Sequence, residues 1–250
     1  MSLSQPAALV TGAGRNIGRE IALALAATGH AIAVNVRATR VEGQAVVDEI
    51  NARGGRALLC VADVGHRAAV TAMVERIGRE WGRLDVLVNN AAVRREADFA
   101  SLSAEDWHAT LRVVLDGAFF CSQAALPLLA AAPQPAIVNI GGLTAHTGAA
   151  ARVHVVTAKA GLVGMTRALA HDLAAQGITV NCVAPGLIDT VRMAASASAS
   201  PRHHATHATL LGRRGSAAEV AQAVVYLAGP QARFVTGQVL HVNGGAYLGG

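Results

Sequence analysis

The stretch that most constrains the fold covers residues 7–18, AALVTGAGRNIG. Its first four residues form an uncharged apolar run, which predicts a strand buried on both faces. A glycine-bearing turn follows, and the pattern over residues 21–25 is helical. Gly12 suits a tight turn with positive φ, and Gly18 lets the helix approach the strand closely. The first N–H groups of the helix would then face an anion, so the stretch predicts a phosphate-binding turn, although such turns also occur without a ligand.

The rest of the chain repeats this alternation of strand and helix. Connections long enough to hold a helix imply parallel strands with right-handed crossovers. We therefore predict an α/β fold of Rossmann type, a doubly wound parallel seven-stranded sheet in one dinucleotide-binding domain spanning residues 1–250. The predicted strands are 7–11, 31–36, 56–61, 84–89, 135–140, 178–184 and 237–242, and the longest predicted helices are 103–131, 152–175 and 216–228.

One segment, residues 187–215, does not fit the alternation. It contains the low-complexity run 194–201 and follows a strand end, where ligands bind in open α/β sheets, so we expect a mobile substrate loop. His203 and His207 have the i, i+4 spacing of zinc ligands on a helix, with His204 between them. No Cys, Asp or Glu lies beside them, so no metal site is predicted.

Charge and composition exclude several classes of function. The net charge of +5 comes from arginines spread along the chain, without a lysine run or interleaved aromatics, so nucleic-acid binding is not expected. No stretch of eighteen residues is continuously apolar, and the N-terminus does not resemble a signal peptide. We expect a soluble cytoplasmic protein that does not bind membranes. Cys60, Cys121 and Cys182 lie far apart in apolar surroundings and are predicted to be reduced core thiols.

Five motifs occur in an order and spacing that chance does not explain. They are TGAGRNIG at 11–18, the Asp63-Val64 pair, NNAA at 89–92, NCVAPGLIDT at 181–190 and GQVLHVNGG at 237–245. With them the chain resembles the classical short-chain dehydrogenase/reductase family over nearly its whole length, in particular members that resemble 3-oxoacyl-(acyl-carrier-protein) reductase. The resemblance implies a bound nicotinamide dinucleotide and, through helices 103–131 and 152–175, a homotetramer.

The resemblance places a cofactor-binding role on specific residues. The family usually has glycine where Asn16 stands, but asparagine tolerates left-handed φ, so the turn can close. The implied residues are Gly12, Arg15, Asn16, Ile17 and Gly18 in the pyrophosphate turn, Asp63 and Val64 at the adenine, Asn89 and Ala91 at the ribose, Pro185, Gly186, Ile188 and Thr190 at the nicotinamide, and Lys159 at its ribose. The alternative roles are a helix cap for Asp63 and a turn for Asn89.

The residue after the second predicted strand favours NADP over NAD. Family members that bind NAD place an acid there, whereas this chain has Arg37, with Arg40 nearby and Arg15 in the first turn. A guanidinium binds the 2′-phosphate of NADP through charge-assisted hydrogen bonds, and a carboxylate repels it. The alternative is that these arginines lie on a solvated surface turn.

The catalytic residues that the resemblance implies are mostly missing. Family reductases use a tyrosine and a lysine at i, i+4 on one helix face, with a serine and an asparagine nearby. Lys159 is present, but the tyrosine position is Val155, the serine position is Gly142 and the asparagine position is Val114. His154 is the nearest ionisable side chain, although it lies five residues before Lys159 and so about a quarter turn away; its alternative role is a helix-surface residue.

Two functional hypotheses follow. The first is a reductase-fold protein that binds NADP(H) but lacks ordinary carbonyl-reductase activity, acting as a cofactor-binding or partner subunit of a related reductase. The alternative is an active NADPH-dependent oxidoreductase for a carbonyl or 3-oxoacyl substrate, with a proton from solvent, His154 or the substrate itself. Thr144 could supply the serine's hydrogen bond but not the tyrosine's proton.

Overall fold

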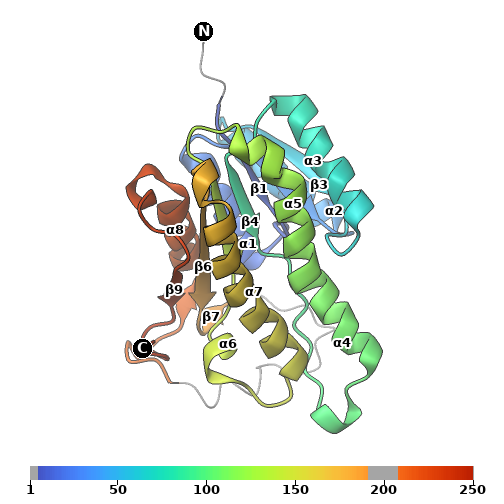
Figure 1. Cartoon of the computed structure of the whole chain (residues 1–250), viewed down its shortest axis with the longest axis vertical. Coiled ribbons are helices and arrows are strands. Elements are labelled where there is room, and N and C mark those ends of the chain that lie inside the picture. Colours follow the sequence, from blue (N-terminus) through green and yellow to red (C-terminus); the bar gives the residue numbers. More distant parts are fainter. Residues whose placement is uncertain (1–4, 191–207, 250) are drawn as a thin grey trace.

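The computed structural model describes residues 5–190 and 208–249, and its centre is a parallel seven-stranded sheet with helices on both faces (Figure 1). The strand order is β3-β2-β1-β4-β5-β6-β9. This confirms the predicted α/β doubly wound fold. The strands are β1 (Ala7–Val10), β2 (Ala31–Val36), β3 (Ala57–Val61), β4 (Val86–Asn89), β5 (Ala136–Ile140), β6 (Thr179–Pro185) and β9 (Val239–Val242).

The strand order reverses between β1 and β4, which are neighbours in the sheet although β2 and β3 separate them in the chain. A crevice forms at such a switch point, beyond the carboxyl ends of the strands. All four residues of β1 are buried because β2 pairs with one edge, β4 pairs with the other, and helices cover both faces. The turn after β1 therefore enters this crevice.

Two layers of helices bury the two faces of the sheet. One core contains apolar residues of α1, α2 and α8, and the other contains those of α3, α5 and α7. The helices are α1 (Asn16–Ala27), α2 (Arg40–Ala52), α3 (Arg67–Trp81), α4 (Ala104–Leu111), α5 (Gly117–Ala130), α6 (Thr144–Thr147), α7 (Val153–Asp172) and α8 (Ala217–Ala228). Short 3-10 turns cover Phe99–Ser101, Ala174–Gln176 and Pro230–Ala232.

The helix predicted over 103–131 is interrupted in its middle. It begins as expected, since the Ser103 hydroxyl accepts a hydrogen bond from the Asp106 N–H at 3.1 Å. A π-helical turn at Arg112–Asp116 then separates α4 from α5. By length and composition, Ala104–Ala130 could cross a membrane, but core helices of soluble proteins meet the same criteria.

A small two-stranded sheet holds the two ends of the unusual segment 187–215. β7 (Ile188–Asp189) pairs in parallel with β8 (Gly215–Ser216), a pairing that the sequence did not predict. The predicted loop at 194–201 and the histidines at 203, 204 and 207 lie outside the described residues. Among those that are described, no group of three or more His, Cys, Asp or Glu could hold a metal ion.

Candidate functional site

The turn after β1 has the geometry that the sequence predicts for a phosphate-binding turn. Gly12 has φ +62° and Asn16 has φ +50°, so asparagine adopts the left-handed conformation expected of it. Asn35, the one polar residue of β2, accepts a hydrogen bond from the Gly12 N–H at 3.3 Å through its side chain. Its amide group also donates to the carbonyls of Cys60 and Ala62. Through these hydrogen bonds, Asn35 of β2 holds the turn after β1 in place.

Gly18 brings the first turn of α1 against the strand ends. A Cβ at this position would lie 2.3 Å from the Gly12 carbonyl oxygen and 2.5 Å from Nδ2 of Asn90. Real Cβ atoms do not approach other atoms so closely, so only glycine fits without movement of the backbone. The close approach leaves space above the helix N-terminus for a ligand.

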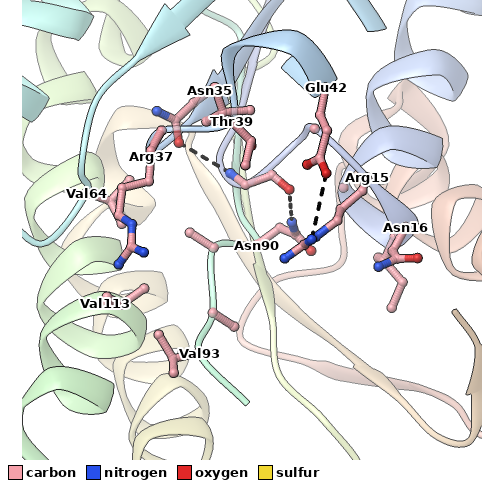
Figure 2. Close-up of a pocket in the computed structure, with 18 of the residues that line it drawn as sticks. Arg15, Asn16, Asn35, Arg37, Thr39, Glu42, Val64, Asn90, Val93 and Val113 are labelled. Carbon is pink, nitrogen blue, oxygen red and sulfur yellow. Dashed lines mark hydrogen bonds and ion pairs between the residues drawn. The ribbon is translucent and has the colours of Figure 1, made fainter. Parts of the chain in front are cut away.

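That space is a cavity of about 470 Å³ at the carboxyl ends of β1, β2 and β4 (Figure 2). Its volume lies within the range of ligand pockets. Among its lining residues are the predicted Gly12, Arg15, Asn16, Ile17, Gly18, Arg37, Asp63, Val64, Ala91 and Thr190.

The cavity is lined by two arginines that the sequence predicts as cofactor-binding residues. Arg15 lies in the turn after β1, and Arg37 directly follows β2. Arg15 lies 3.8 Å from Glu42 of α2, in an ion pair that Figure 2 draws. Both side chains are substantially exposed, so this ion pair is weak, and Arg15 can leave Glu42 to pair with another anion. Arg37 is exposed. The sequence did not anticipate the carboxylate of Glu42 beside Arg15.

The structure places the side chain of Asn89, which the resemblance assigns to the cofactor ribose, away from the cavity. The Asn89 side chain is buried, donates to Asn139 Oδ1 at 2.9 Å and to Ser122 Oγ at 3.2 Å, and does not line the cavity. Its neighbour Asn90 lines the cavity instead and donates to the carbonyls of Thr11 and Gly12. Successive side chains of an extended chain point to opposite sides, so the side chains of Asn89 and Asn90 have different surroundings.

A smaller cavity of about 100 Å³ lies where the family's catalytic groups were expected. Ile17, Arg94 and Thr190 line both cavities, so the two adjoin. Val114 does not line either; it is buried with Ala118, Ala158 and Leu162. The smaller cavity is lined by Ile17, Arg94, Ile140, Gly141, Gly142, Leu143, Thr144, Arg152, Val155, Lys159, Pro185, Gly186, Leu187, Ile188 and Thr190.

Lys159 is the one member of the expected catalytic set in this cavity that can carry a proton. Its Nζ donates a hydrogen bond to the Ile140 carbonyl at 2.5 Å. Burial, together with the positive charges of Arg94 and Arg152, lowers its pKa to about 7. Cys182 lies close by, but burial raises the pKa of its thiol to about 11, so it remains protonated at neutral pH.

His154 does not reach either cavity. It is fully buried at the start of α7 and does not line either of them. Burial and the charge of Arg152 lower its pKa, so the ring is neutral at neutral pH. The expected alternative, a helix-surface histidine, is wrong, because burial hides the ring from solvent.

Besides Glu42, sequence reasoning missed Asn35, Asn90, Arg94 and Arg152 at the site. A single asparagine within the apolar strand AIAVNV was a visible signal for Asn35. Arg94 and Arg152 come from separate loops, before α4 and before α7, and only the fold brings them to one cavity. No local sequence pattern could therefore predict that these two side chains line the same cavity.

Comparisons with known proteins show similarity over nearly the whole chain. A family model described as enoyl-(acyl carrier protein) reductase matches residues 12–247. The 3-oxoacyl-(acyl-carrier-protein) reductase of Staphylococcus aureus is 38% identical over 241 residues, which cover 96% of this chain and 98% of the relative. The (2S)-((R)-hydroxy(phenyl)methyl)succinyl-CoA dehydrogenase subunit BbsD of Thauera aromatica is 41% identical over 249 residues, 99% of each chain.

Two solved structures share the fold over nearly their whole length. A short-chain dehydrogenase from Burkholderia cenocepacia, in complex with NADP, is 36% identical with a TM-score of 0.90, covering 98% of this chain and 99% of its own. A dehydrogenase/reductase from Sinorhizobium meliloti is 34% identical with a TM-score of 0.91, covering 99% of this chain and 97% of its own.

Proposed function

The chain belongs to the short-chain dehydrogenase/reductase family, and on that premise we propose that it binds NADP(H) but does not perform ordinary carbonyl reduction. Three observations support cofactor binding: the glycine turn, the adjoining cavity of about 470 Å³, and the two arginines, Arg15 and Arg37, that line it. The related Burkholderia structure is in complex with NADP. When bound, NADPH would supply a hydride; the residues above bind and orient the dinucleotide.

One observation carries the second half of the proposal. Val155 and Gly142 line the smaller cavity, and they stand where the resemblance implies the family's tyrosine and serine. Neither side chain can donate a proton or a hydrogen bond, and Thr144 offers only a hydroxyl. Such a subunit would act by holding the cofactor or a partner, either in a homotetramer or beside an active relative. The Thauera relative is itself named as a subunit.

The test is a binding titration with NADPH and NADH, followed on the same sample by turnover with a ketone and a 3-oxoacyl thioester. We expect saturable NADPH binding and no substrate-dependent NADPH oxidation. Robust oxidation of NADPH would overturn the proposed loss of activity. Absence of any fluorescence or thermal shift with either cofactor would overturn the proposed binding.

The second candidate is an active oxidoreductase with a different proton donor. The observation that favours it is the pKa of Lys159, which is about 7. A general acid works best when its pKa lies near the pH at which the enzyme operates. The version that uses His154 has less support because that ring is buried away from both cavities. If His154→Ala leaves any measured turnover unchanged, that version is rejected.

Charge reversal at Arg37 tests the choice of cofactor. We expect Arg37→Asp to weaken NADPH binding at least tenfold and to weaken NADH binding far less, because a carboxylate repels the 2′-phosphate and accepts bonds from ribose hydroxyls. Arg40→Ala is the matched control, since Arg40 is also exposed but does not line the cavity. Equal losses for both cofactors, or an equal effect of Arg40→Ala, would contradict the prediction.

A further inference from the structure

Glu42, in the first turn of α2, places a carboxylate on the wall of the larger cavity (Figure 2). Its Oε1 lies 3.8 Å from Nη1 of Arg15. The start of α2 packs closely against the sheet, because a Cβ at the neighbouring Gly43 would lie only 2.6 Å from Cδ1 of Leu59 in β3. This packing fixes the backbone of Glu42 beside the cavity.

The side chain of Glu42 also lies close to the turn after β1. A Cβ added at Gly14 would lie 3.4 Å from the Cβ of Glu42 and 3.6 Å from its Oε2. One carboxylate oxygen is therefore beside Arg15 and the other beside Gly14. The side chains of Arg15 and Glu42 are 50% and 38% exposed, so solvent reaches both, and either can move when a ligand enters the cavity.

A structural role within α2 is the simpler alternative for Glu42. An acid in the first turn of a helix interacts favourably with the helix dipole. That role requires no ligand, and it predicts that loss of the charge slightly lowers stability and leaves the choice of cofactor unchanged. The position of the carboxylate on the cavity wall, paired with an arginine that the proposed function assigns to the cofactor, indicates a second role.

We propose that Glu42 is a specificity-determining residue, which reduces the preference of this site for NADPH over NADH by pairing with Arg15. The inference rests on the proposed function, in which Arg15 and Arg37 bind the 2′-phosphate of NADPH. That phosphate must compete with Glu42 for Arg15, and apparent affinity falls with the fraction of protein in which Arg15 is available. NADH has a hydroxyl in place of the 2′-phosphate and gains little from a free guanidinium.

The experiment is fluorescence titration of the unmodified protein and of Glu42→Gln with NADPH and NADH. Glutamine keeps the length of the side chain and removes its charge. We expect the variant to bind NADPH about three- to fivefold more tightly, as the strength of an exposed ion pair allows, and NADH with unchanged affinity. An equal gain for both cofactors, or no gain for NADPH in a folded variant, would overturn the proposal.

Two further measurements show whether the effect is electrostatic and concerns the 2′-phosphate. At about 1 M salt the screening length is about 3 Å, so the gain in NADPH affinity should largely disappear. Calorimetric titration with adenosine 2′,5′-bisphosphate should show the gain, and titration with AMP, which lacks the 2′-phosphate, should not. A gain that persists at high salt, or that appears with AMP, would contradict the proposed competition.

A control variant and a double variant assign the effect to the ion pair. Asp48→Asn removes the same charge from an exposed position on α2 that does not line the cavity, and it should leave the affinity for NADPH unchanged. In an Arg15→Gln background, Glu42→Gln should give no gain, because the arginine for which the phosphate competes is absent. A full gain in that background would overturn the role given to Arg15.

The same titrations separate this inference from the proposed function. If the unmodified protein binds NADPH and Glu42→Gln binds it with equal affinity, only this inference is rejected. If Glu42→Gln binds NADPH and the unmodified protein does not, the competition by Glu42 is supported and the proposed binding of NADP(H) by the unmodified protein is rejected.

Discussion

Replacing Gly18 by alanine is expected to abolish NADPH binding and to lower the free energy of unfolding by about 1–3 kcal/mol. The added Cβ would lie 2.3 Å from the Gly12 carbonyl oxygen and 2.5 Å from Asn90 Nδ2, so α1 must move away from the strand ends. That movement would displace the helix N–H groups from the position of a phosphate. Denaturant unfolding measures the loss of stability, and NADPH fluorescence titration measures the loss of binding.

A second glycine gives the matched control for this substitution. Gly164 lies within α7, and a Cβ added there meets no atom within 4 Å. Gly164→Ala should therefore leave NADPH binding unchanged and raise stability by about 0.5–1 kcal/mol, as expected for glycine to alanine inside a helix. Tight NADPH binding by Gly18→Ala would show that the turn is not where the pyrophosphate lies.

Much of the fold could be predicted because its signals are local. Each of the seven predicted strands lies within two residues of an observed one at both ends, since buried parallel strands are short apolar runs between turns. The cap formed by the Ser103 hydroxyl and the left-handed backbone of Asn16 could be predicted because each depends on the side chain of a single residue. The β7–β8 pair escaped prediction because its strands have two residues each and pair across a long connection.

The site could be predicted only in part, for a physical reason. The glycine turn, Asp63 and Thr190, all named from the motifs, line the cavity. The side chain of Asn90 lines it and that of Asn89 does not, and a motif does not state which way a side chain faces. The cluster of Arg94, Arg152 and Lys159 depends on how β4, α4 and α7 meet, which no local pattern encodes.

The positions at which the resemblance implies catalytic groups are well ordered in this chain. Val114, at the implied asparagine position, is 2% exposed and lies in the π-helical turn at Arg112–Asp116. Lys159 still reaches the end of β5 through the Ile140 carbonyl. At Gly142 an added Cβ would meet no atom within 4 Å. There is therefore space for a side chain at the implied serine position, so introducing the implied serine and tyrosine is a direct test of the proposed function.

The double variant Gly142→Ser/Val155→Tyr is expected to gain NADPH oxidation with a 3-oxoacyl thioester, at least about 100-fold above the unmodified protein. A positioned general acid contributes about 10²–10⁴-fold to rate. The introduced tyrosine would lie one helical turn before Lys159, beside a cavity of about 100 Å³ that gives the ring space, and the positive charges nearby would lower the pKa of its hydroxyl. The rate is measured from the loss of NADPH absorbance at saturating cofactor.

The matched control is Gly142→Ser/Val155→Phe, which adds the same ring without the hydroxyl. We expect this control to bind NADPH and remain inactive, so any difference between the two variants reports proton transfer by the tyrosine. Equal activity in both would show that the ring only reshapes the cavity. If the unmodified protein already oxidises NADPH as fast as the tyrosine variant, another group supplies the proton, and Lys159, which titrates near pH 7 in the same cavity, becomes the first candidate.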